Sequence, residues 1–160
     1  MLTQKRIKGA NHAKRIYQNS NDGTVIRLEE INAEVFSKKV LGEGFAIKFT
    51  GTELISPFDG TVIATFPTGH AFLVRREDGL EVLMHCGLSS AKMPQAFEAQ
   101  VKKYQKVKAG DVLTKVKPDL FTDEQRICPV VFSKPDLEAI VVKTNVETKA
   151  LDETAVKVVY

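Results

Sequence analysis

The sequence contains few cysteines and no long apolar segment. Its 160 residues include two cysteines, Cys86 and Cys128, too few for a disulfide framework and without the spacing of a metal site. We therefore expect two reduced, buried thiols. No run approaches the roughly 20 apolar residues of a membrane span. Nothing near residue 1 has the apolar core of a signal peptide. The sequence thus predicts a cytoplasmic protein without membrane insertion.

Charge is nearly balanced, with a formal net charge of only +3. Part of the basic excess lies near the N-terminus, in Lys5, Arg6, Lys8, Lys14 and Arg15. We expect residues 1–19, which include His12, to be a basic, loosely ordered lead-in. No interleaved arginine and aromatic residues follow this cluster, so nucleic acid is not an expected partner. Residues 20–160 have a length that suits one domain with a sizeable core.

The sequence does contain many short apolar stretches, rich in valine and isoleucine and separated by Gly and Pro turns. Residues 22–26 recur as residues 59–63, and residues 110–113 form a related turn before an apolar stretch. Residues 34–41 fit a short helical turn or an irregular loop, and residues 118–126 fit a helix. The pattern predicts an all-β protein, an antiparallel β-sandwich or flattened barrel with duplicated β motifs and one or two short helices.

Two of the three histidines, His70 and His85, lie on either side of the dipeptide Asp78-Gly79. Asp-Gly between two apolar runs is a strong hairpin signal. With a two-residue loop, Phe72 faces His85 and His70 is a diagonal neighbour of His85 on the same face. A three-residue loop would move the pairing by one residue and place the two rings on opposite faces.

Two neutral imidazoles on one face can bind a metal, share a proton or pass on a group that one of them carries. Ordinary strand histidines are the alternative. A zinc hydrolase is the least favoured hypothesis, because catalytic zinc usually has three protein ligands and the remaining histidine is His12. Weak binding of a zinc ion by His70, His85 and a carboxylate of a partner protein is an alternative that stays open. We expect no cofactor.

A series of motifs carries a resemblance to a known family. They are Asp22-Gly23, Val35-Phe36, Gly42-x-Gly44-x-Ala46-Ile47, Pro57-x-Asp59-Gly60, Pro67-Thr68-x-His70-Ala71, Gly79-x-Glu81, His85-x-Gly87, Gly110-Asp111 and Pro129-Val130-Val131. From about residue 20 to 143, the chain resembles the glucose-type enzyme IIA of the bacterial sugar phosphotransferase system. The resemblance implies an all-β sandwich and a role as a phosphoryl carrier.

In that role a small histidine phosphocarrier protein would phosphorylate His85. The phosphoryl group would then pass to a cysteine of a sugar-specific enzyme IIB domain of a permease. The resemblance implies that His70 helps hold the phosphoryl group, with Thr68 beside it. We expect a backbone carbonyl near Gly87 to select one tautomer of His85. Partner docking calls for a shallow site ringed by apolar side chains. The candidates are Val35, Phe36, Val40, Leu41, Phe66 and Leu83.

The sequence departs from the family pattern at two positions. Many members have acidic residues where this chain has Ala33 and Ser89, and such acids are expected to meet arginine on the phosphocarrier. Glu34 or Glu43 is a candidate substitute. The departures keep open a second hypothesis, a regulatory binding protein that uses the same histidine face to control permeases or kinases without efficient phosphotransfer.

Overall fold

The computed structural model describes residues 20–134, 139–142, 146–148 and 156–159, so the predicted lead-in and His12 lie outside the described residues. The described chain is mostly β-strand. The strands are β1 (Gly23–Arg27), β2 (Glu43–Phe49), β3 (Glu53–Ile55), β4 (Gly60–Thr65), β5 (Ala71–Arg76), β6 (Glu81–His85), β7 (Phe97–Ala99), β8 (Lys106–Val107), β9 (Val112–Val116), β10 (Ile127–Lys134), β11 (Ala139–Val142), β12 (Val146–Thr148) and β13 (Val156–Val159). The helical turns are α1 (Glu34–Ser37) and the 3₁₀ turns η2 (Leu28–Glu30), η3 (Ser90–Lys92), η4 (Pro94–Ala96) and η5 (Pro118–Leu120).

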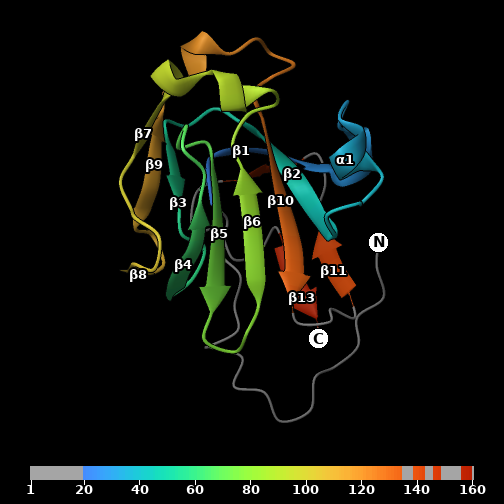
Figure 1. The fold of residues 1–160 in the computed structure, drawn as a ribbon. Coiled ribbons are helices and arrows are strands. Elements are labelled where there is room, and N and C mark those ends of the chain that lie inside the picture. The colour runs from blue at the N-terminus through green and yellow to red at the C-terminus, as the bar shows by residue number, and fades with distance from the viewer. Residues whose placement is uncertain (1–19, 135–138, 143–145, 149–155, 160) are drawn as a thin grey trace.

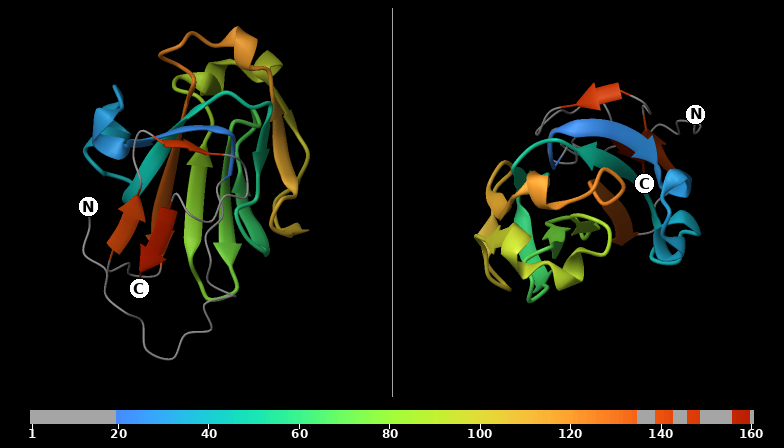
Figure 2. Two further views of the ribbon diagram at one scale, coloured as in Figure 1. Left: turned by 180° about the vertical axis from the view of Figure 1, so that it is seen from behind. Right: turned by 90° about the horizontal axis from the view of Figure 1, so that it is seen from above.

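The strands form three sheets, and every pairing between described strands is antiparallel. The largest sheet has the order β12-β1-β2-β10-β6-β5-β4-β8, and smaller sheets have the orders β3-β9-β7 and β11-β13. Figures 1 and 2 show the β3-β9-β7 sheet beside the β4–β5 end of the large sheet. The all-β antiparallel prediction is confirmed, and among the described strands the large sheet is open rather than closed into a barrel.

The repeated sequence motif marks the start of a strand each time. The first copy begins β1 at Gly23, the second begins β4 at Gly60, and the related stretch that follows Gly110 begins β9 at Val112. A glycine turn followed by β-branched residues thus has the same structural outcome at three places in the chain.

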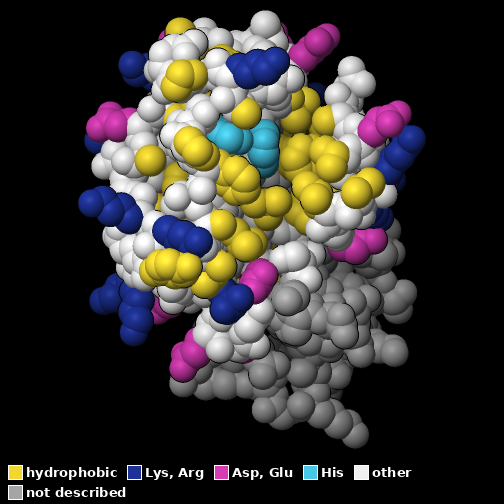
Figure 3. Space-filling model, viewed as in Figure 1, with side chains coloured by type: hydrophobic (Ala, Val, Ile, Leu, Met, Phe, Trp, Pro, Cys, Tyr) yellow, Lys and Arg dark blue, Asp and Glu magenta, His cyan; other side chains and the backbone are white. Residues whose placement is uncertain are grey.

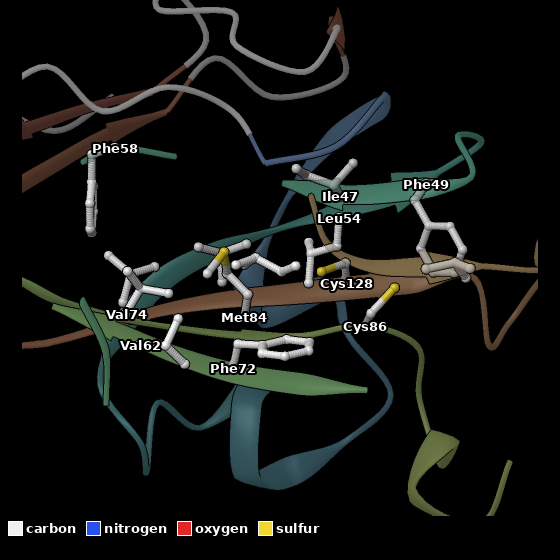
Figure 4. Packing of buried hydrophobic residues seen from close by; sticks show 14 of the residues in the cluster. Ile47, Phe49, Leu54, Phe58, Val62, Phe72, Val74, Met84, Cys86 and Cys128 are labelled. Atoms are coloured by element: carbon white, nitrogen blue, oxygen red, sulfur yellow. The ribbon is translucent and has the colours of Figure 1, made fainter. Parts of the chain in front are cut away.

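The main core lies between the large sheet and the β3-β9-β7 sheet. It contains side chains from both, such as Phe45 and Phe72 of the large sheet and Leu54 and Leu113 of the small one, all fully buried. Cys86 and Cys128 are buried free thiols in this core, as predicted (Figure 4). Contact with Cys128, together with burial, raises the pKa of the Cys86 thiol. No helix among the described residues is long and apolar enough to cross a membrane.

The predicted helix over residues 118–126 is wrong beyond its first turn. Only η5 forms, because Phe121 has an extended backbone and a buried side chain that packs edge-on against Phe49 and Phe97. A turn follows, in which the backbone N–H of Gln125 donates to the carbonyl of Thr122 (3.0 Å). Tertiary packing of one aromatic ring therefore overrides the local helical pattern.

Candidate active site

The hairpin that carries the two histidines has a three-residue loop, Glu77 to Gly79. The Arg76 N–H donates to the Leu80 carbonyl (2.8 Å), and Gly79 has a φ of +95°. The Arg76 guanidinium donates two bonds to the Asp78 carboxylate (2.9 Å each), which stabilises this longer loop. Ala71 rather than Phe72 consequently faces His85. The register predicted from a two-residue Asp-Gly loop is wrong by one residue.

The two imidazole rings nevertheless meet. Their centroids lie 4.8 Å apart, with an angle of 77° between the planes. His70 precedes β5, which begins at Ala71, so the alternation of a regular strand does not determine where its ring points. Hydrogen bonds from the Phe66 N–H to the Ala71 carbonyl (3.2 Å) and from the Gly69 N–H to the Phe66 carbonyl (2.8 Å) form a tight turn at this entry. The turn, not the strand register, brings His70 against His85.

Apolar side chains surround the pair (Figure 3). The Phe36 ring packs edge-on against His85 (5.4 Å between centroids), and the Phe66 ring lies 5.7 Å from His70. Four of the six predicted docking residues are exposed hydrophobic side chains, namely Val35 (42%), Val40 (69%), Leu41 (42%) and Phe66 (41%). Leu83 is half-buried, whereas Phe36 is buried. Phe36 therefore contributes its ring to the packing around His85.

Burial affects the charge state of both rings. Burial and the nearby His85 lower the pKa of His70 from 6.5 to about 4. Burial also lowers the pKa of His85, and the backbone carbonyls of Gly87 and His85 offset part of this shift because they favour the protonated ring. Both rings are therefore neutral at neutral pH. The Nδ1 atoms of both rings are buried and lack a hydrogen-bond partner of good geometry.

Two hydroxyl groups organise the loop after His85. Ser90, which is buried, donates a hydrogen bond to the Gly87 carbonyl (2.9 Å), the same carbonyl that acts on the His85 ring. Thr68 donates to the Ala91 carbonyl (2.7 Å), which ties the entry of β5 to η3. Sequence reasoning missed Ser90, because a serine three residues after a glycine is too common to be a signal.

Sequence reasoning also missed Phe97, whose ring centroid lies 6.2 Å from that of His70. Phe97 begins β7, a strand of only three residues. Its place beside His70 depends on the packing of the small sheet against the large one. Local sequence patterns do not predict how one sheet packs against another, so they could not place Phe97 at the site.

The acidic residues proposed as substitutes for Ala33 and Ser89 already have basic neighbours. Glu34 pairs with Lys38 (3.4 Å), and Glu43 pairs with Lys39 (3.0 Å). Three other acidic residues, Glu30, Asp123 and Glu124, line a hollow of about 620 Å³ together with Ser89 and Lys48. Of these acids, Asp123 pairs with Arg126 (3.2 Å).

Of the side chains at the site, the two histidines have the chemistry of metal ligands. Within the described residues, no group of three or more His, Cys, Asp and Glu side chains is close enough to hold a metal ion. His70 and His85 thus supply two possible ligands, and a partner would have to supply any third.

The chain matches known proteins over most of its length. Residues 15–137 match the family described as phosphoenolpyruvate-dependent sugar phosphotransferase system, EIIA 1. The chain is 35% identical over 132 residues to the PTS system glucose-specific EIIA component of Mycoplasma capricolum, covering 82% of this chain and 80% of the relative. It is 37% identical over 131 residues to the protein of the same name from Bacillus cereus, covering 80% and 79%.

A solved structure and a multidomain relative agree with this assignment. Glucose permease IIA from Mycoplasma capricolum superposes with a TM-score of 0.78 at 33% identity, covering 88% of this chain and 94% of that one. The PTS system glucose-specific EIICBA component of Streptococcus pneumoniae is 44% identical over 93 residues, 58% of this chain and 13% of that protein. The chain therefore belongs to the EIIA family of the phosphoenolpyruvate-dependent sugar phosphotransferase system.

Proposed function

We propose that this protein accepts a phosphoryl group from a histidine phosphocarrier protein on His85 and passes it to a cysteine of an enzyme IIB domain of a sugar permease. One observation carries the proposal most directly. Two adjoining neutral imidazoles, His85 half-buried and His70 buried, lie within a ring of exposed apolar side chains. Family membership supports a phosphocarrier role. The transfer would take place in the cytoplasm and needs no cofactor.

His85 is the nucleophile in this proposal. Its Nδ1 is buried, which leaves Nε2 as the nitrogen that a partner can reach. In the first step a bond forms between His85 Nε2 and phosphorus, while the bond between phosphorus and the carrier's histidine breaks. In the second step a cysteine thiolate attacks phosphorus and the bond to His85 Nε2 breaks. A lowered pKa helps, because a neutral ring has the lone pair that the first step requires.

His70 stabilises the transferring group. A neutral imidazole beside the nucleophile can donate one hydrogen bond to an equatorial phosphoryl oxygen. Thr68 acts indirectly in this scheme, because its hydroxyl proton is bound to the Ala91 carbonyl and holds the loop beside the site. The Gly87 carbonyl, positioned by Ser90, favours a proton on Nδ1 of His85 and so leaves the Nε2 lone pair free.

Docking would rest on the apolar ring. Val35, Val40, Leu41 and Phe66 are exposed without being part of the core, which is the composition of a surface that two partners bind in turn. The acidic hollow beside Ser89 supplies negative charge for arginine on the phosphocarrier, in place of acids at positions 33 and 89.

The test is transfer from a phosphorylated histidine phosphocarrier to the purified protein and then to an enzyme IIB domain. We expect acid-labile phosphate on the protein, none on His85→Gln, and a rate lower by about 100-fold for His70→Gln, because one donor to the transition state is lost. Val40→Ser should weaken docking without altering the fold.

A regulatory binding protein is the second candidate, favoured by Ala33 and Ser89. A folded protein that takes up no phosphate on His85 but binds a permease through the histidine face would replace the carrier proposal with this one.

A further inference from the structure

We infer that the face formed by β7, β8, β9 and their connections is a docking surface for an anionic lipid bilayer. Residues 92–117 contain seven lysines and two acidic residues, whereas the whole chain has a net charge of only +3. The lysines are Lys92, Lys102, Lys103, Lys106, Lys108, Lys115 and Lys117. All seven are exposed. Positive charge is therefore concentrated on one part of the folded surface.

Most of these lysines keep their charge available, whereas Lys115 lies directly opposite Glu98 of β7 and Glu53 of β3. Among the described residues, no ion pair joins any of the seven to an acidic side chain. Of the two acidic residues in the segment, Asp111 accepts a hydrogen bond from the backbone N–H of Lys108 (2.9 Å). In Figure 3, dark blue side chains recur along the left side of the molecule, which is the side where Figure 1 shows β7, β8 and β9.

An exposed aromatic side chain, that of Tyr104, lies among these lysines in the sequence. Tyr104 is 69% exposed and has a φ of +70°, a left-handed conformation that is unusual for a bulky residue. Its N–H donates to the Val62 carbonyl (2.6 Å), and the Gln105 N–H donates to the Lys102 carbonyl (3.1 Å). The turn is thus tied to β4. The Lys103 ammonium lies 4.8 Å from the Tyr104 ring centroid, so ring and charge point outward together.

The face is also hollowed at one end. Lys106 and Lys108 line a hollow of about 690 Å³ together with Arg75 of β5. Three acids also line it: Asp59 and Asp111 each accept a backbone N–H bond, and Glu77 is exposed. The hollow offers a place where a phosphate headgroup can approach several cationic groups at once.

The chemistry favours a bilayer over other anionic partners. Lysines with an exposed tyrosine are typical of protein surfaces at the membrane interface, where an amphipathic ring lies at headgroup level. Residues 92–117 lack arginine, the side chain best suited to bidentate recognition of bases and phosphates, so a specific nucleic acid site is less favoured than a bilayer. Binding through this face would leave the neighbouring histidine site free and hold the protein where a permease lies.

Vesicle flotation with the full chain tests the inference. We expect binding to vesicles of phosphatidylglycerol and phosphatidylcholine and none to phosphatidylcholine alone. Each lysine near an anionic surface strengthens binding by about 5-fold. The variant K102Q/K103Q/K106Q/K108Q, which removes four such charges, should therefore bind roughly several hundred-fold more weakly. Tyr104→Ser should also weaken binding. Circular dichroism would confirm that these exposed substitutions leave the fold intact.

A matched variant, K5Q/R6Q/K8Q/K14Q, removes four charges near the N-terminus and should bind like the unchanged protein. Binding that is lost in this variant but kept in the four-lysine variant overturns the inference, as does no binding to phosphatidylglycerol vesicles. Equal affinity for single-stranded DNA, with no effect of Tyr104→Ser, would mark general polyanion binding and also overturn it. Uptake of phosphate by the four-lysine variant in solution should be unchanged, so failure here is separable from failure of the carrier proposal.

Discussion

Acid should destabilise this protein through its buried imidazoles. The pKa of His70 is 6.5 in the unfolded chain and about 4 in the folded one. Below about pH 6.5 the unfolded chain therefore binds more protons, and stability present at neutral pH is lost as the pH falls toward 4. Linkage predicts a loss of about 2.5 kcal/mol between about pH 7.5 and about pH 4.5 from His70 alone. His85, whose pKa is also lowered, adds to the loss.

Urea unfolding of the unchanged protein and of His70→Gln at both pH values measures this contribution. Carboxylates titrate in both proteins, so the difference between their losses isolates His70. The unchanged protein should lose about 2.5 kcal/mol more than the variant, a value large enough to resolve by linear extrapolation. His12→Gln, which removes the remaining histidine of the sequence, should behave like the unchanged protein. Equal losses in the unchanged protein and in His70→Gln would refute the link between burial and charge state.

Three further substitutions test how the site is held. Gly87→Ala should lower the free energy of unfolding by about 2 kcal/mol or more in thermal melts, because φ is +87° and a Cβ would lie 2.7 Å from the Phe121 ring. Phe36→Ala should cost about 3 kcal/mol and raise the pKa of His85 in an NMR titration, because it removes the ring that covers His85. Ser90→Ala should cost about 1 kcal/mol and lower the pKa of His85, because the Gly87 carbonyl that raises this pKa loses the hydroxyl that positions it.

The hairpin that carries the histidines shows which structural features a sequence pattern predicts and which it does not. Two apolar runs around Asp78-Gly79 correctly predict paired strands, because that signal is local. The pairing itself depends on whether the loop has two or three residues, and here the Arg76 guanidinium and Asp78 carboxylate stabilise the longer loop. A one-residue change in register moves side chains to the opposite face. The rings meet only because His70 lies in a turn before β5, which strand periodicity does not describe.

The residues around the site were likewise predictable from the sequence only in part. Val35, Val40, Leu41 and Phe66 are exposed in the structure, and the sequence marks them as apolar without distinguishing surface from core. Phe36 and Phe121 are equally apolar in the sequence, but in the structure both are buried by side chains from distant parts of the chain. Ser90 and Phe97 reach the site through the loop and the small sheet, and neither contact has a counterpart in local spacing.

In the proposed mechanism His85 carries the phosphoryl group at Nε2. Phosphorus–nitrogen correlation NMR on ¹⁵N-histidine-labelled protein, after phosphorylation by a histidine phosphocarrier, locates that bond directly. The geometry predicts a single phosphorylated nitrogen, Nε2 of His85, with His70 unmodified. A phosphoryl group on His70 or on Nδ1 of either ring would contradict the account, and so would a folded protein that carries none.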